Sequence, residues 1–193
     1  MNRIKLMIDH LKGDNILDVG FIGNYPYEFK LHNLLKKKFK NVFGLDLRYA
    51  KVENSIVGNA LKMPFKPQSI DSILAGEIIE HFVETEEFLS ECKMILKNKG
   101  RLIITTPNRN SYFNILFKIS FCEDHRRLFS KKDLEYYLKK AGFKYKMFTI
   151  CYVDSFTPHM RSNNKIIFFI RKVLHKILPE NLHEGFLAVC EKL

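Results

Sequence analysis

The sequence predicts an α/β fold built on a mostly parallel sheet. The first observation is an apolar strand pattern from Ile16 to Val19 that breaks at Gly20 and continues as a helix. The second is the alternation of strand and helix patterns that follows, as far as residue 108. Because parallel strands are joined by crossover helices, this alternation indicates a doubly wound sheet. A length of 193 residues suits a single domain.

Apolar periodicity and end signals define the other elements of the first half. Residues 2–12 form an amphipathic helix that ends at Gly13. Residues 84–99 form another, with acids in the first turn, lysines in the last and Gly100 behind it, which complements the helix dipole. The helix after Gly20 carries its apolar stripe on Leu31, Leu34, Leu35 and Phe39, and strands are expected at 42–45, 55–57, 70–75 and 102–105.

The C-terminal half departs from this regular alternation. Residues 109–129 are aromatic and basic and read as irregular. Ser130 then begins a helix as its N-cap, with Asp133 as the capping-box partner, and Gly142 ends it. A basic amphipathic helix is expected at 165–178, between strands at 144–152 and 185–190.

The formal net charge of +11 bears on the kind of partner that the surface suits. A strongly basic balance favours a polyanion such as nucleic acid, or an anionic membrane surface. The same count also results from lysines on a solvated surface, and the basic residues here are spread along the chain rather than gathered in one block. Charge alone leaves both interpretations open.

The cysteines and the N-terminal residues bear on metal sites and location. None of the four cysteines stands in a C-x-x-C pair, which argues against zinc and a disulfide framework, so no metal is expected. The chain starts without the apolar run of a signal peptide, and no segment approaches the ~20 apolar residues of a spanning helix. These features predict a soluble cytoplasmic protein with reduced thiols at Cys92, Cys122, Cys151 and Cys190.

The strand, turn and helix around Gly20 also predict a ligand site. Such a turn directs free backbone N–H groups and the positive end of the helix dipole to one point, at the carboxyl ends of the strands. Asp46 closes the second strand ~20 residues past the glycines, where an acid holds a ribose hydroxyl in dinucleotide-type folds. An acid there can also cap a helix or a turn. The glycine turn favours the ribose interpretation and predicts a nucleotide-like cofactor.

Further segments extend this pattern in a fixed order. After the first motif, Ile16 to Gly20, they are Phe43 to Asp46, Gly58 to Phe65, Ile70 to His81, Leu96 to Leu102 and Thr105 to Asn108. Each segment alone is a weak signal, but together their order and spacing resemble the class I S-adenosylmethionine-dependent methyltransferases, in particular the type 11-like branch. The resemblance covers nearly the whole chain.

This resemblance implies a fold, a domain organisation and a cofactor. The fold would be a Rossmann-like three-layer sandwich with a seven-stranded, mostly parallel sheet and an antiparallel last strand, which agrees with the strands counted above. Residues 1–193 would form a single methyltransferase domain, with substrate-side segments at about 109–129 and 153–182. The cofactor would be S-adenosyl-L-methionine.

The resemblance also assigns roles to single residues. Asp46 would hold the ribose hydroxyls, and the backbone of Gly20 and Gly23 would face the methionyl part. Asp18 would lie near the methionyl ammonium or accept a hydrogen bond from a helix. The remaining residues would be Asn59, Ala60 and Met63 around the adenine, Ala60 through its N–H and Met63 by packing, and Gly76 beside the transferable methyl group.

Two departures from the family pattern predict weaker cofactor binding. Ile22 and Asn24 stand where the first motif usually has its second and third glycines, and a branched residue at 22 limits positive φ and close backbone approach. Asn24 is the milder change, because asparagine adopts the left-handed conformation. Asn59 replaces a common aspartate, although its amide can still accept from the adenine amino group and donate to a ring nitrogen.

Two histidines are candidate general bases. An imidazole titrates near neutrality and can take a proton from a hydroxyl or an amine. His81 follows the fourth strand, where its counterpart in similar proteins often faces the substrate, but it could also cap or pack at the start of the next helix. His125 stands in a stretch that forms one wall of the active site in similar proteins, and Arg126 or Arg127 could pair with an anionic substrate. A solvated loop is the alternative for that stretch.

The acceptor and the partners remain open at the level of sequence. The helix at 165–178 could lie on an anionic membrane or meet a lipid-linked substrate, or it could pack on the sheet edge or a second subunit. A small-molecule, lipid or saccharide acceptor, methylated on oxygen or nitrogen, is the leading hypothesis. A nucleic-acid acceptor is favoured only by charge, since Gly76 to Ile79 lacks the Asp/Asn-Pro-Pro-Tyr/Phe motif of base-methylating enzymes. A non-catalytic cofactor- or partner-binding protein is favoured only by Ile22.

Overall fold

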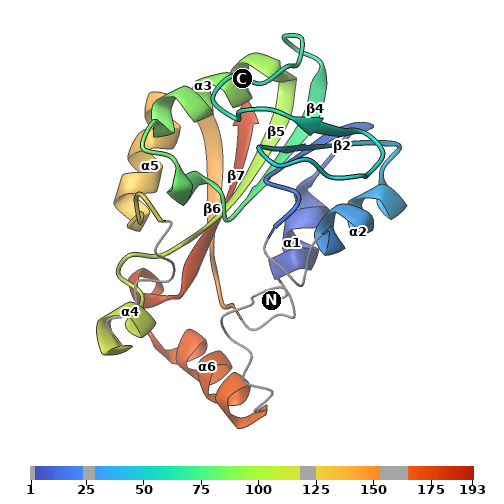
Figure 1. Cartoon of the computed structure of the whole chain (residues 1–193). Coiled ribbons are helices and arrows are strands. Elements are labelled where there is room, and N and C mark those ends of the chain that lie inside the picture. Colours follow the sequence, from blue (N-terminus) through green and yellow to red (C-terminus); the bar gives the residue numbers. More distant parts are fainter. Residues whose placement is uncertain (1–2, 24–28, 118–124, 153–164) are drawn as a thin grey trace.

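The computed structural model of the chain describes residues 3–23, 29–117, 125–152 and 165–193. A seven-stranded sheet in the order β3-β2-β1-β4-β5-β7-β6 forms its centre (Figure 1). Strand β7 pairs antiparallel with both β5 and β6, and the remaining pairs are parallel. The predicted fold class is therefore confirmed. The strands are β1 (Asn15–Val19), β2 (Asn41–Asp46), β3 (Ser55–Val57), β4 (Ile70–Gly76), β5 (Leu96–Pro107), β6 (Phe143–Ile150) and β7 (Gly185–Lys192).

Helices cover both faces of this sheet, which makes it the middle of three layers (Figure 1). Successive residues of a strand point to opposite faces. Ile73 of β4 accordingly packs with apolar residues of α3 and α5, whereas Leu74 packs with those of α1 and α2. The helices are α1 (Arg3–His10), α2 (Lys30–Lys38), α3 (Thr85–Ile95), α4 (Tyr112–Phe117), α5 (Lys131–Lys140) and α6 (Lys165–Ile177), with 3-10 turns η1 (Ile79–His81) and η3 (Glu180–Leu182).

The helix predicted at 84–99 ends four residues earlier than its charge pattern indicates. Helix α3 stops at Ile95, and Leu96 begins β5 by pairing with Ile70. Ser69 N donates to Ile95 O (2.9 Å), so the end of the helix is bonded to the start of β4 rather than to a further turn. Lys99 then takes a left-handed φ of 60°. Tertiary pairing of this backbone overrides the lysine signal at the helix end.

The stretch 109–129, expected to be irregular, contains a short helix. In α4, Ser111 Oγ accepts a hydrogen bond from Asn114 N (3.2 Å), which is the geometry of an N-cap. Residues 118–124 lie outside the described part. The predicted capping box at the start of α5 is confirmed: Ser130 Oγ accepts from Asp133 N (3.3 Å), and the Asp133 carboxylate accepts from Ser130 N (2.9 Å).

The described residues also bear on the membrane and thiol predictions. None of their helices is both long and apolar enough to span a bilayer. Cys92, Cys151 and Cys190 are buried free thiols, while Cys122 lies outside the described part.

Candidate functional site

A cavity of about 750 Å³ opens at the carboxyl ends of β1, β2 and β4. The chain reverses the order in which it adds strands between β1 and β4, and ligands bind at such switch points in open α/β sheets. Most of the residues singled out in the sequence line this cavity. They are Asp18, Gly20, Gly23, Asp46, Asn59, Ala60, Gly76 and His81.

The glycine turn forms the floor of the cavity next to β1. Gly20 has a φ of 72°, and its N–H donates to Leu45 O (2.8 Å), which bends the chain tightly against β2. A Cβ at position 20 would lie 2.9 Å from the Cδ1 atom of Ile78. Both the backbone conformation and the space at this position therefore require glycine. Gly23 is also left-handed, with a φ of 64°.

Ile22 does not have the position that its place in the motif suggested. It is absent from the residues with positive φ, and it does not line the cavity. Its side chain is buried among Phe21, Ala50, Phe29 and Val52, while its N–H points to Asp46. Position 22 therefore does not use a positive φ, and weaker cofactor binding at Ile22 stays a prediction. Asn24 lies outside the described residues.

Asp46 presents its carboxylate to the cavity from the end of β2. Its side chain is 8 % exposed. Oδ2 accepts from Ile22 N (3.3 Å), and Oδ1 accepts from both the backbone N (3.0 Å) and Nε (3.2 Å) of Arg48. A carboxylate has about four acceptor positions, so one remains for a ligand hydroxyl. The contact with the half-exposed Arg48 side chain is the one that a second hydroxyl can replace.

The loop after β3 forms the opposite wall. Asn59 and Ala60 line the cavity, and Asn59 Oδ1 accepts from Leu61 N (2.9 Å), which fixes the amide in the loop. Its oxygen keeps a second lone pair and its NH₂ two donors. Met63 lies behind this wall instead: it is buried in the core with Ala60, and its N–H donates to Glu91 (3.0 Å). It does not line the cavity.

Asp18 is held by a helix residue that the sequence reading overlooked. His32 Nδ1 of α2 lies 3.1 Å from Asp18 Oδ2, and both side chains are buried. Burial raises the pKa of Asp18, although the hydrogen bond and charge of His32 oppose that shift. Of the two roles left open for Asp18, this contact favours the helix-facing acceptor. The sequence signal that could have predicted this contact is a polar residue, His32, next to the apolar stripe of its helix.

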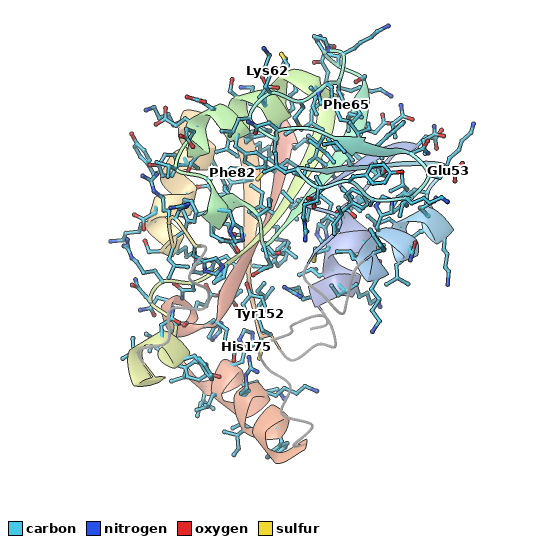
Figure 2. All side chains as sticks on the ribbon, in the orientation of Figure 1. Glu53, Lys62, Phe65, Phe82, Tyr152 and His175 are labelled. Atoms are coloured by element: carbon cyan, nitrogen blue, oxygen red, sulfur yellow. The ribbon has the colours of Figure 1, made fainter. Side chains whose placement is uncertain are left out.

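A second overlooked group lies beside Gly76. Glu77 pairs with Arg3 of α1 (3.3 Å) and accepts from the Tyr152 hydroxyl (2.8 and 2.9 Å; Figure 2). Glu77 has a left-handed φ of 54°, and such strain persists where surrounding contacts enforce it. A Cβ at Gly76 would lie 3.2 Å from Met7 Cε. Helix α1 thus closes the cavity over the end of β4.

The two candidate bases lie against each other. The His81 and His125 rings are 5.1 Å apart at an interplanar angle of 73°. His81 and Phe82 line the cavity, whereas His125 is not part of the lining; of the three, Phe82 is labelled in Figure 2. The N–H groups of Arg126 and Arg127 both donate to Glu80 O (2.9 and 3.0 Å), which fixes His125 against η1. The predicted pair is brought together, but only one member reaches the cavity.

Comparisons with known proteins agree with this site. A family model described as "Methyltransferase domain" matches residues 27–104. A probable S-adenosylmethionine-dependent methyltransferase of Mycolicibacterium smegmatis is 27% identical over 142 residues, covering 68% of this chain and 52% of that protein. These matches support a class I S-adenosylmethionine-dependent methyltransferase. It spans about half the length of the first curated relatives that it matches.

Solved methyltransferases share the fold of this methyltransferase domain. A SAM-dependent methyltransferase from Archaeoglobus fulgidus has a TM-score of 0.72 at 18% identity, covering 98% of this chain and 91% of that one. Geranyl diphosphate C-methyltransferase from Streptomyces coelicolor, solved with Mg²⁺, geranyl diphosphate and S-adenosyl-L-homocysteine, has a TM-score of 0.66 at 16% identity over 99% and 80% of the chains. At these identities the likeness concerns the fold.

The family's cofactor, S-adenosyl-L-methionine, fits the residues present. The carboxylate of Asp46 supplies acceptors for two vicinal hydroxyls at one end of the cavity. Gly20 has no Cβ and a φ of 72°, at a turn where a backbone can approach a ligand. Asn59 offers amide donors and an acceptor for a purine edge. Along the chain, Gly20, Asp46 and Asn59 follow the order in which the methionyl part, the ribose and the adenine of the cofactor are connected.

Proposed function

We propose that this domain transfers a methyl group from S-adenosyl-L-methionine to an oxygen or nitrogen of a small-molecule or lipid-type acceptor. The observation that carries the proposal is that Asp46, Gly20, Asn59 and His81 all line the same cavity. A cofactor held at the first three residues would leave its reactive end beside Gly76 and His81. A cavity of about 750 Å³ is in the range of small-molecule sites.

Within this proposal the chain's residues bind the cofactor, orient the acceptor and exclude water from the cavity. Asp46 accepts hydrogen bonds from the ribose hydroxyls, the Gly20 turn faces the methionyl part, and Asn59 with Ala60 contacts the adenine. Met63 supports that contact from the core. Arg3 also lines the cavity, where it is paired with Glu77. Asp18 orients the turn through His32.

When bound, S-adenosylmethionine supplies a sulfonium methyl group, and transfer forms the acceptor–carbon bond while the carbon–sulfur bond breaks to leave a thioether. The chain's task is then to align the acceptor and to receive its proton. Ile78, His81 and Phe82 line the cavity on this side. We further propose that the described parts of segments 109–129 and 153–182 bound the acceptor; residues 153–164 lie outside the described part.

Calorimetric titration of the protein with S-adenosylmethionine and with S-adenosylhomocysteine tests the cofactor half of the proposal. We expect saturable binding of both. Binding without turnover on any class of acceptor would favour the non-catalytic alternative. Absence of binding to either molecule would contradict the proposed function.

Replacing His81 with alanine is expected to lower turnover by about 100-fold or more, because a positioned general base contributes 10²–10⁴-fold. His125→Ala should reduce turnover less than His81→Ala, since His125 does not line the cavity. The measurement is the initial rate of methyl transfer at saturating cofactor, with cofactor affinity measured in parallel. Full turnover in both variants would eliminate the histidines as bases.

The nucleic-acid alternative rests on the net charge of +11. Two of the cationic side chains that line the cavity are already paired with acids, Arg3 with Glu77 and Arg48 with Asp46. These ion pairs lessen the positive charge that a phosphate backbone would meet at the site entrance. Retention of the protein on RNA at moderate salt is the observation that would favour this alternative.

We also propose that α6 contacts an anionic membrane surface. Phe169, Ile170, Val173 and Ile177 are exposed along one side of the helix, and Lys172 and Lys176, also exposed, lie next to them. The opposite side is held to the domain by the buried Arg171. An exposed apolar stripe flanked by lysines suits the interface of an anionic bilayer.

Flotation with vesicles tests the α6 contact. We expect the protein to float with vesicles that contain phosphatidylserine and to float less with phosphatidylcholine alone. Phe169→Ser should reduce flotation, because it removes a side chain that is 68% exposed on α6. Tyr136→Ser, at a side chain 57% exposed on α5, is the matched control and should have no effect. Equal flotation of both variants, or no binding to either vesicle, contradicts the contact.

A further inference from the structure

Three side chains of types that can bind a metal lie together beside the cavity, and one of them, His81, lines it. The ligand atoms of Glu80, His81 and His125 all lie within 4.8 Å of one another. Glu80 Oε1 is 4.0 Å from His125 Nε2. Glu80 and His81 belong to η1, directly after β4, while His125 comes from the segment before α5. Tertiary structure alone brings the third group to the other two.

The scaffold holds this cluster through backbone and side-chain hydrogen bonds. Glu80 O accepts from Arg126 N and Arg127 N, which fixes the position of His125. On the side chain of Glu80, Oε2 accepts from Thr106 Oγ1 of β5 (3.0 Å). Both elements that carry the cluster are therefore anchored to the end of the sheet, as a preorganised site requires.

The Glu80 carboxyl group is buried with one oxygen unsatisfied. The residue is 0% exposed, and Oε1 has no hydrogen-bond partner among the described residues. A buried acceptor without a partner is costly, and a bound cation would satisfy it. Oε1 is the atom that faces His125.

We propose that Glu80, His81 and His125 bind a divalent transition-metal ion such as Zn²⁺, Co²⁺ or Mn²⁺. Two imidazoles and one carboxylate are a donor set for these metals and unlike the all-oxygen sites of Ca²⁺ and Mg²⁺. Ligand atoms about 2.1 Å from a tetrahedral ion lie about 3.4 Å apart, so the side chains close in by small χ rotations. The sequence predicted no metal because it lacks cysteine metal motifs, but this donor set contains no cysteine.

Three protein ligands leave one coordination position of a tetrahedral ion open. Because His81 lines the cavity, we expect this open position to face the cavity. Resting on the proposed function, we assign that position to an oxygen of the acceptor. The imidazoles would then act as ligands instead of bases, and a hydroxyl coordinated at that position, with its pKa lowered by the ion, would release its proton to water. A plain histidine–carboxylate network without an ion is the competing outcome.

The test is titration of the chelator-treated protein with Co²⁺, followed by visible absorption. We expect saturable binding with bands that indicate nitrogen ligands, and at least about 10-fold weaker binding in His125→Gln and in His81→Gln. His175→Gln is the matched control, since His175, labelled in Figure 2, forms another histidine pair with His183, with ring centroids 3.9 Å apart. That control should bind Co²⁺ like the unmodified protein.

Two results would overturn the metal site. One is the absence of saturable Co²⁺ binding by the unmodified protein, and the other is binding that His175→Gln removes while His125→Gln keeps it. Circular dichroism of the same variants reports whether they fold. Their affinity for S-adenosylhomocysteine reports whether the cofactor site is intact. Failure of cofactor binding with an intact Co²⁺ site would sink the proposed function and leave the metal site standing.

Discussion

Arg171→Leu is expected to lower the free energy of unfolding by about 3–5 kcal/mol, because it leaves a buried carboxylate without its cation. The Arg171 and Glu184 side chains are 4% and 0% exposed. Arg171 Nε donates to Glu184 Oε1 (2.8 Å), and Nη2 donates to Oε2. Glu184 also accepts from the Tyr112 hydroxyl and from Tyr152 N, both at 2.6 Å. One carboxylate thus ties α4, α6 and the end of β6 to β7.

The sign of the pH dependence follows from the pKa of Glu184. Burial alone would raise this pKa, but the hydrogen bonds and charge of Arg171, with help from Tyr112 and Tyr152, hold it below its usual value. A lowered folded-state pKa stabilises the protein fully above the ordinary glutamate value of about 4.3 and progressively less as the pH falls through the folded-state pKa. The loss in Arg171→Leu should therefore be largest near neutral pH and shrink on acidification.

Urea unfolding at several pH values measures both effects. Adding Glu184→Gln to Arg171→Leu should recover part of the loss, since it removes the unpaired charge while an oxygen remains for Tyr152 N. Lys131→Leu is the matched control, because the Lys131–Glu180 pair is exposed and worth at most about 1 kcal/mol. A loss in Arg171→Leu no larger than in Lys131→Leu would show that the buried pair does not stabilise the fold.

Asp46→Asn is expected to weaken S-adenosylmethionine binding by about 1.5–3 kcal/mol, or roughly 10- to 150-fold in Kd, the value of hydrogen bonds to a charged group. Asparagine keeps the volume but replaces one acceptor oxygen with a donor. Its NH₂ would face either the Ile22 or the Arg48 N–H group, and the ribose hydroxyls would lose an acceptor. Because Asp46 already accepts three hydrogen bonds, some loss of stability should accompany the loss of affinity.

Calorimetry at a temperature well below the unfolding transition separates these two effects. Glu53→Gln is the matched control: Glu53 is an acid in the segment after β2 whose side chain is 77% exposed and paired with Lys36, and it does not line the cavity. It should bind the cofactor unchanged. Equal affinities for Asp46→Asn and the unmodified protein would remove Asp46 from the proposed ribose contact.

Local sequence patterns were sufficient to predict the sheet and the residues that line the part of the cavity proposed to hold the cofactor. The strand before Gly20, the acid at Asp46 and the loop at Asn59 each follow a strand of a parallel sheet. Carboxyl ends of parallel strands converge on one edge, so their order along the chain predicts that these residues meet. Ile22 shows the limit of this reasoning, because a motif position does not determine which way a side chain points.

The helix end that local sequence patterns predicted wrongly is determined by strand pairing with a segment distant in the sequence. Leu96 reads as the last turn of a charged helix, but its partner in the sheet is Ile70. A helix end and a strand start differ little in local free energy, so ladder hydrogen bonds from another element select between them.

For this protein, the sequence by itself predicted the α/β class, the succession of strands along the chain and the resemblance to a methyltransferase family, because these depend on short-range periodicity and on the spacing of motifs. Tertiary structure alone decided that His32 pairs with Asp18 and Arg171 with Glu184, and it alone brings His125 to 4.0 Å from Glu80. Partners such as Glu80 and His125 lie far apart in the chain and meet only once helices and loops are packed on the sheet. Burial then makes each pairing strong, since a polar group removed from water must find its partner within the fold.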